Sequence, residues 1–118
     1  MIAAAVFTAD PVDGYPPGTP LGPPTSISVT GLMHFMAGAL GFLCLALSGL
    51  GAAWALNRLR LPSLALLSLV SGLTVLVGFF GGIVLPLGIV GIWTAVVVGW
   101  IWLSVLSMRL AAIPREAR

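Results

Sequence analysis

Residues 31–60 read GLMHFMAGALGFLCLALSGLGAAWALNRLR, and this stretch decides the fold. It carries no Asp, Glu, Lys or Arg until Arg58 and Arg60. The apolar part is longer than the ~20 helical residues that cross a hydrocarbon core of about 30 Å. Charged side chains are costly in hydrocarbon, so the arginines mark the point where the chain leaves it. The stretch therefore predicts a transmembrane helix over residues 30–56.

Two further apolar runs follow the first one. The second extends over residues 63–85, just after Pro62, and the third covers residues 88–110. Each is long enough to cross a bilayer once. Hydrophobic residues make up 59% of the chain and charged residues 7%, too little polar surface for a soluble domain. The sequence therefore predicts an all-α membrane protein with three transmembrane helices over residues 30–110 and a cytoplasmic tail over residues 111–118.

The segment before the first helix is rich in proline and glycine. Residues 10–28, DPVDGYPPGTPLGPPTSIS, include six prolines and three glycines, which favour turns and exclude a helix. Residues 1–9 are too short to span, so we expect a helix stub there and a loop outside the bilayer up to residue 29. Hydroxyl side chains at the start of the first long helix are candidates for its N-cap: Ser26, Ser28 and Thr30.

The five basic residues, all arginines, predict the orientation of the chain. Arg58 and Arg60 lie between the first two helices, and Arg109, Arg115 and Arg118 lie at or after the end of the third. In a three-span chain these segments share one side, and basic loops remain cytoplasmic. We therefore expect a cytoplasmic C-terminus and an external Pro/Gly-rich loop. The net charge of +2 is explained by orientation, so no nucleic-acid partner is expected.

Small side chains recur along each predicted helix, where they would let another backbone approach closely. In the first helix they form what we call the small-residue stripe: His34, Ala37, Gly38, Gly41, Cys44, Ser48, Gly51, Ala52 and Ala55. The second helix offers Ser68, Ser71, Gly78 and Gly82, and the third offers Gly91, Ala95 and Gly99. We expect other transmembrane helices to pack on these faces.

The spans contain little that could carry out chemistry. His34 is the one ionisable side chain well inside a predicted span, whereas Asp10 and Asp13 lie in the loop. A metal site needs three or four ligands, and a serine nucleophile needs a base within hydrogen-bond reach. The single cysteine, Cys44, excludes a disulfide framework. The sequence predicts no catalytic, metal or cofactor-binding residues, and an enzyme is not favoured.

His34 is compatible with two roles. It lies about one turn inside the first helix, near the acidic loop. It could sense protons or bind a ligand together with Asp10 or Asp13, or it could tie the loop to the helix through a hydrogen bond. We favour the second interpretation, because one histidine with flexible partners rarely builds a switch.

Two motifs resemble a known family. Residues 3–20, AAAVFTADPVDGYPPGTP, and residues 31–38, GLMHFMAG, are similar to the second half of a six-span bacterial and archaeal membrane family catalogued as domain of unknown function 998. That family typically has an Asp-Pro and glycine-rich external loop between its third and fourth spans, and a Gly-x-x-His element at the start of the fourth. The matching positions are Asp10, Pro11, Gly14, Gly18, Gly31 and His34. Residues 91–110 resemble the family's last span.

The chain departs from the family in two ways. Thr94 and Ala95 stand where members often have a polar residue and an arginine, and the first three spans do not precede this sequence. The resemblance implies a cell-membrane protein of prokaryotic type and an architecture, but no reaction. We expect a structural or interaction component that is a piece of a six-span protein. Its partners would be the other helices of that protein, a second copy or another subunit. The alternative is a transporter-like or ligand- or pH-sensing protein that uses His34 and the acidic loop.

Overall fold

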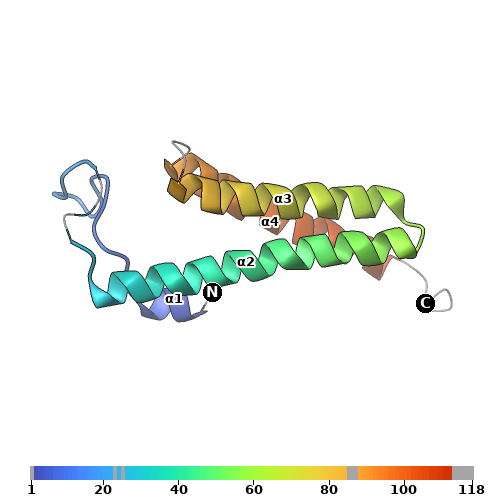
Figure 1. Ribbon diagram of the computed structural model, residues 1–118, viewed down its shortest axis with the longest axis horizontal. Coiled ribbons are helices and arrows are strands. Elements are labelled where there is room, and N and C mark those ends of the chain that lie inside the picture. The colour runs from blue at the N-terminus through green and yellow to red at the C-terminus, as the bar shows by residue number, and fades with distance from the viewer. Residues whose placement is uncertain (1, 23, 25, 85–87, 113–118) are drawn as a thin grey trace. The chain divides into compact units, whose positions relative to one another are not determined.

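The described part of the chain consists of helices, one long loop and one short turn. The computed structural model describes residues 2–22, 24, 26–84 and 88–112. Its helices are α1 (Ile2–Val6), α2 (Val29–Arg58), α3 (Pro62–Val84) and α4 (Gly88–Ala111) (Figure 1). The last three are long and apolar enough to cross a membrane. These helices confirm the predicted all-α membrane fold. The predicted end of the second span at Leu85, together with Arg115 and Arg118, lies outside the described residues.

The chain divides into two compact units, Met1–Gly41 and Phe42–Arg118. The division falls inside α2, whereas the sequence suggested one between the loop and the first span. The first unit contains α1, the Pro/Gly-rich loop and the first turns of α2. The loop belongs with these turns because its side chains and backbone bond to them, as described below. The second unit contains the rest of α2 together with α3 and α4.

In the second unit, α2 and α3 run antiparallel and approach each other closely. The rings of Phe42 and Phe79 stack with centroids 4.3 Å apart. Two turns along, a Cβ added to Gly49 would lie 2.9 Å from the Cα of Gly72. Side chains are excluded at such a distance, so the two glycines allow direct backbone contact. The stacked aromatic pair adds about 0.5–1.5 kcal/mol to the burial of its rings.

The contact between α3 and α4 is also antiparallel and uses small residues. A Cβ added to Gly78 would lie 2.8 Å from the carbonyl oxygen of Gly91 and 3.3 Å from the Cβ of Ala95. One turn further along α3, a Cβ added to Gly82 would meet the carbonyl oxygen of Gly88 at 2.8 Å. The two backbones therefore pack with little side chain between them.

A buried hydrogen bond joins the other halves of α3 and α4. The indole Nε1 of Trp102 donates to the Oγ of Ser68 over 2.9 Å. Ser68 is fully buried and Trp102 is 4% exposed. Such bonds between membrane helices contribute about 0.6 kcal/mol on average. The bond also satisfies an indole donor that hydrocarbon would leave unpaired.

Gly99 of α4 receives a side chain from α2. A Cβ added to Gly99 would lie 2.8 Å from Leu45 Cδ2 and 3.6 Å from Val75 Cγ2 of α3. Leu45 was the one large residue that interrupted the predicted small-residue stripe. In the structure it fills the space that Gly99 leaves open, so the three helices of the second unit meet at this level.

The face of α2 that packs in the second unit is not the small-residue stripe. The buried positions follow a different register: Phe42, Ala46, Gly49, Ala53 and Leu56. Cys44, Ser48 and Gly51 are exposed. The two registers are offset by two residues, which is about 200° around an α-helix. Both contain small residues at four- and three-residue spacing, so small size alone does not select the packed face.

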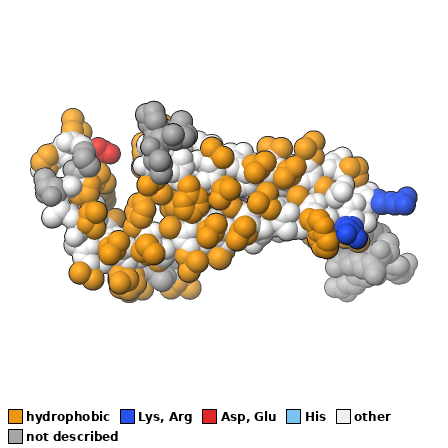
Figure 2. Space-filling model, viewed as in Figure 1, with side chains coloured by type: hydrophobic (Ala, Val, Ile, Leu, Met, Phe, Trp, Pro, Cys, Tyr) orange, Lys and Arg blue, Asp and Glu red, His pale blue; other side chains and the backbone are white. Residues whose placement is uncertain are grey.

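Large apolar side chains remain on the outside of the helices, as lipid requires. Leu47, Trp54, Leu66, Val77 and Trp100 are each more than half exposed. Figure 2 shows hydrophobic side chains spread over the surface of the molecule. Exposure on this scale would aggregate a soluble protein, whereas lipid tails solvate it. The chain is therefore an integral membrane protein that crosses the bilayer several times.

Candidate functional site

The Pro/Gly-rich loop has a defined closure formed by Asp13 and Gly22. The amide of Asp13 donates to the carbonyl oxygen of Gly22, and the amide of Gly22 donates to Asp13 Oδ1, both over 3.1 Å. Asp13 has a φ of +50°, in the left-handed region that aspartate tolerates better than most residues. The Asp13 carboxylate thus holds the two sides of the loop together.

The segment between these two residues forms further turns. Val12 and Tyr15 exchange two backbone hydrogen bonds of 3.0 Å. Both the amide and the hydroxyl of Thr19 donate to the carbonyl oxygen of Pro16, over 3.0 and 2.7 Å. Prolines offer no N–H but retain their carbonyl acceptors, which is how a proline-rich segment builds these turns.

Asp10 completes the N-terminal cap of α2. The amide of Ser28 donates to Asp10 Oδ2 over 3.0 Å, and Ser28 Oγ accepts from the amide of Gly31 over 2.9 Å. The carbonyl oxygen of Ser28 accepts the first helical bond, from Leu32, over 2.9 Å. Ser28 is therefore the N-cap among the three candidates. In a capping box an acidic residue inside the helix accepts from the cap amide, but here Asp10 supplies that acceptor from outside the helix.

The charge of Asp10 also suits this position. The first turn of α2 contains no acidic residue. The unpaired amides of a helix N-terminus carry a partial positive charge, so a nearby carboxylate stabilises them by about 0.3–1 kcal/mol. Asp10 is the carboxylate that the helix itself lacks.

Gly31 explains why the carboxylate can come so close. A Cβ built on Gly31 would collide with the carboxylate of Asp10. Any side chain at this position would push the loop away from the helix end. Glycine is required here for close approach, and its backbone conformation is ordinary helix.

His34 ties α2 to the segment that precedes the loop. Its Nδ1 lies 2.9 Å from the carbonyl oxygen of Phe7, the residue that follows α1. A carbonyl oxygen only accepts, so Nδ1 carries the hydrogen in this bond. Carbonyls at the end of a helix lack partners within the helix, and a histidine donor satisfies one of them. His34 is partly buried in this contact.

The structure thus brings Asp10 and His34 together at the N-terminal end of α2. Both residues attach the segment before the loop, residues 7–10, to this helix. Gly31 and His34 are three residues apart and face the same side of the helix. Asp10 fastens the beginning of the loop to the cap, and His34 fastens Phe7, three residues earlier. Asp13 lies in the loop and bonds within it. The three candidate residues therefore each engage backbone groups.

A cavity of about 450 Å³ lies in the loop. Its lining combines one carboxylate, two hydroxyl-bearing residues and prolines: Asp10, Pro11, Gly18, Thr19, Pro20, Pro24 and Ser26. Within residues 2–22, 24, 26–84 and 88–112, no three His, Cys, Asp or Glu side chains cluster as metal ligands. The cavity offers hydrogen bonds and one negative charge to a small polar molecule.

The predicted packing residues divide between the two units. In the first unit, a Cβ added to Gly38 would meet no atom within 4 Å, and Gly41 is half-buried. In the second unit, the hydroxyl of Ser48 donates to the carbonyl oxygen of Cys44 over 2.7 Å and faces outward. Gly78, Gly82, Gly91 and Ala95 lie where α3 and α4 meet, and Gly99 faces Leu45 of α2 and Val75 of α3.

Sequence reasoning missed the acceptors on which this end of α2 depends. The Asp10–Ser28 bond joins residues 18 apart, and the partner of His34 is a backbone carbonyl 27 residues away. Every residue has a backbone carbonyl oxygen, so residue identity does not show which of them accepts a hydrogen bond. The one available signal was the Gly-x-x-His spacing, because it places a residue without a side chain beside a donor on one helix face.

Comparisons with known proteins agree with this architecture. A family model described as protein of unknown function (DUF998) matches residues 1–109. No curated protein and no solved structure matches the chain.

Proposed function

The chain belongs to the DUF998 family of membrane proteins of unknown function, and from this premise we propose that it is a structural or interaction component of the cell membrane. In this proposal the helices form a scaffold in the bilayer, and the loop between α1 and α2 is held in a fixed shape outside it. The loop is the part that other molecules meet. His34 and Asp10 serve the scaffold by fastening the loop.

The observation that carries this proposal is the use of the ionisable groups. His34 donates to a backbone carbonyl, and Asp10 accepts from a backbone amide at the N-cap of α2. Groups that transport protons or ions must exchange partners during the cycle. Groups that cap helix ends contribute stability in one arrangement, and these two hydrogen bonds are of that kind.

The proposal includes an orientation with the arginine end in the cytoplasm. The antiparallel pairings of Gly49 with Gly72 and of Ser68 with Trp102 support it, since they bring Arg58 and Arg109 to one end of the second unit. Basic residues favour the cytoplasmic side. The loop with Asp10 precedes the opposite end of α2 and is therefore external in this arrangement.

The proposal also includes further transmembrane helices as partners. Part of the small-residue stripe, namely Cys44, Ser48 and Gly51, lies exposed on α2. Small exposed residues allow another helix to approach the backbone at low cost. The partner helices would come from a second copy, another subunit or further spans of a longer chain of this family.

A second candidate function is ligand sensing by the loop, and the cavity beside Asp10 favours it. Asp10 lines this cavity of about 450 Å³ and also caps α2, so a ligand that drew on its carboxylate would alter the start of the helix. Ligand binding would then change how the loop is attached to α2.

A pH series distinguishes a structural role of His34 from pH sensing by this side chain. Neutral histidine with hydrogen on Nδ1 and protonated histidine both donate from Nδ1, so a structural tie survives protonation. For the purified protein in lipid nanodiscs, we expect hydrogen exchange of the loop amides, corrected for the intrinsic rate, to be constant between pH 5.5 and 7.5. A step in protection across this range that His34→Asn and His34→Leu both abolish would instead establish sensing.

A further inference from the structure

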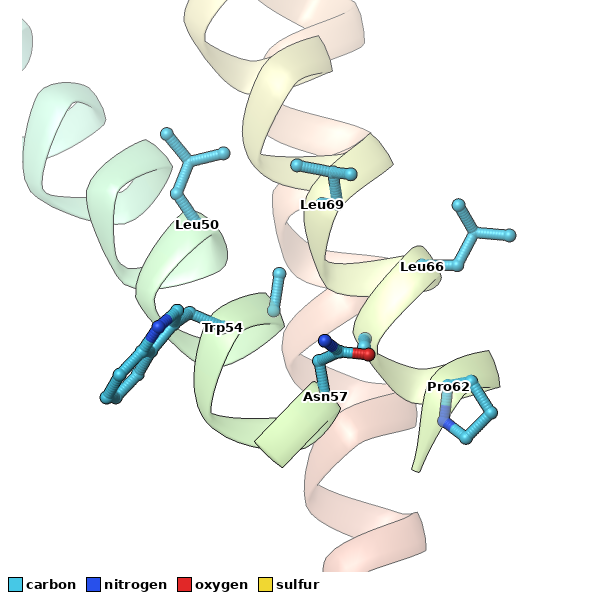
Figure 3. Close-up of a pocket in the computed structure, with 8 residues that line it drawn as sticks. Leu50, Trp54, Asn57, Pro62, Leu66 and Leu69 are labelled. Carbon is cyan, nitrogen blue, oxygen red and sulfur yellow. The ribbon is translucent and has the colours of Figure 1, made fainter. Parts of the chain in front are cut away.

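A groove lies between α2 and α3 at the end where they are joined. It has a volume of about 490 Å³ and is open to the side (Figure 3). Its walls are formed by three residues of α2 and three of α3: Leu50, Trp54, Asn57, Pro62, Leu66 and Leu69. Ala53 and Ala65, each 8% exposed, form its floor. The methyl groups of these two alanines leave a space between the larger side chains of the walls.

The groove is apolar along its length and polar at its mouth. Figure 3 shows Leu50 and Leu69 near each other at one end, and the amide of Asn57 between the two helices at the other. Asn57 and Pro62 are joined by the turn that carries Arg58 and Arg60. The groove therefore runs from the hydrocarbon side of the helices to the basic interface.

Arg58 lies beside this mouth. Its guanidinium carbon is 4.9 Å from the centroid of the Trp54 ring, which forms part of the groove wall. Arginine on an aromatic face keeps its donors directed outward, so it can still bind an anion. Trp54 itself is 66% exposed, as expected for an aromatic side chain at the membrane interface.

Arg60 occupies a position that glycine normally fills. It has a φ of +58°, and two bonds close the end of α2 around it: Arg60 N to Asn57 O and Leu61 N to Leu56 O, 3.1 and 3.0 Å. These bonds form a Schellman motif with Arg60 as its left-handed residue. Glycine adopts this conformation at lower cost. The feature that arginine adds at this position is its charged side chain.

The positive charges have no acidic partner nearby in the sequence. Residues 42–112 contain three arginines and neither aspartate nor glutamate. Arg58 and Arg60 lie at a membrane interface next to an apolar groove. A molecule that complements both features has a hydrocarbon chain and an anionic headgroup.

We propose that this groove binds one anionic phospholipid, with an acyl chain along Leu50, Leu66 and Leu69 and the phosphate at Asn57, Arg58 and Arg60. Basic residues at the ends of membrane helices attract anionic lipids, and the groove adds a fixed place for the chain. The inference requires that the helices span a bilayer and does not depend on the role of the loop.

Native mass spectrometry of the detergent-solubilised full chain tests the charged end of the site. The probes are phosphatidylglycerol, with one net negative charge, and phosphatidylcholine with the same acyl chains. We expect the parent to bind phosphatidylglycerol more tightly, and the double variant Arg58→Gln/Arg60→Gln to bind it about 25-fold more weakly, at about five-fold for each arginine. Arg109→Gln, at the same end but on α4, is the control and should bind like the parent.

A second pair of variants tests the groove without changing its charge. Leu69→Trp fills the groove, while Leu73→Trp makes the same change one turn further along α3, outside the groove lining. The two leucines are 42% and 46% exposed, so both variants should fold, as checked by far-UV circular dichroism. We expect Leu69→Trp to weaken binding of both lipids and Leu73→Trp to leave it unchanged. Equal affinity of the parent for the two lipids would overturn the proposal. So would equal effects of the double arginine variant and Arg109→Gln, or of Leu69→Trp and Leu73→Trp.

Discussion

The carboxylate of Asp10 accepts a 3.0 Å hydrogen bond from the amide of Ser28 and so completes the N-terminal cap of α2 from outside the helix. Ser28 provides the local half of the cap through its bond to Gly31. The longest helix of the chain therefore begins at a point that the preceding loop helps to define. This relationship gives the acidic side chain of the loop a stabilising role that requires no chemistry.

Removing this cap should loosen the start of α2. Asp10→Ala takes away an acceptor and a negative charge at the helix N-terminus, at an expected cost of about 1 kcal/mol. This loss of about 1 kcal/mol should make hydrogen exchange of the peptide that covers residues 26–32 about five-fold faster. Asp13→Ala is the matched control, because it opens the loop at Gly22 and should leave this peptide protected. Equal exchange in parent and Asp10→Ala would show that the cap is not formed.

Replacing His34 should separate a tie from other roles of the ring. Asn keeps a side-chain donor near the position of Nδ1, so His34→Asn should retain much of the bond to the Phe7 carbonyl, whereas His34→Leu cannot form it. We expect limited proteolysis of the loop to stay near the parent rate for Asn and to rise several-fold for Leu. Similar rates for both variants, whether slow or fast, would contradict this role.

Packing of α3 on α4 should be far more sensitive to size than the exposed face of α2. In Gly78→Leu the new side chain would meet the Gly91 carbonyl, since even a Cβ would lie 2.8 Å from it, and the helices must separate. Overpacking of this kind costs about 1–3 kcal/mol. Gly51→Leu is the control, because a Cβ there meets no atom within 4 Å. Thermal unfolding in detergent should be lowered by Gly78→Leu alone, and equal midpoints would refute the described contact.

Two leucines test the proposed orientation. Leu21 in the loop is 89% exposed, and Leu59 in the α2–α3 turn is 68% exposed. With Cys44 replaced by Ser, we expect Leu21→Cys to react with an impermeant thiol reagent in sealed cells and Leu59→Cys to react only after permeabilisation. The basic turn should remain inside because cationic loops are translocated poorly. The opposite pattern would invert the topology.

The sequence by itself determined where the helices lie. Hydrophobic length and the polar groups that end each run predicted three long helices, and α2, α3 and α4 begin and end within two residues of those predictions. This works because each backbone group in hydrocarbon must bond within its own helix, so the span is a local property of the chain. Gly31 and His34 were also visible as a pair, through the Gly-x-x-His element that resembles the family.

Only the tertiary structure decided which surfaces meet. Within the second unit the α2 register of Ala46, Gly49 and Ala53 is buried, while the equally small register of Cys44, Ser48 and Gly51 is exposed. Residue size allows close approach on either face, and the choice depends on what the neighbouring helix offers. Gly72 of α3 leaves room opposite Gly49, and Gly99 of α4 leaves room for Leu45. The partners of Asp10 and His34 are backbone groups brought close by folding, so no sequence pattern could have specified them.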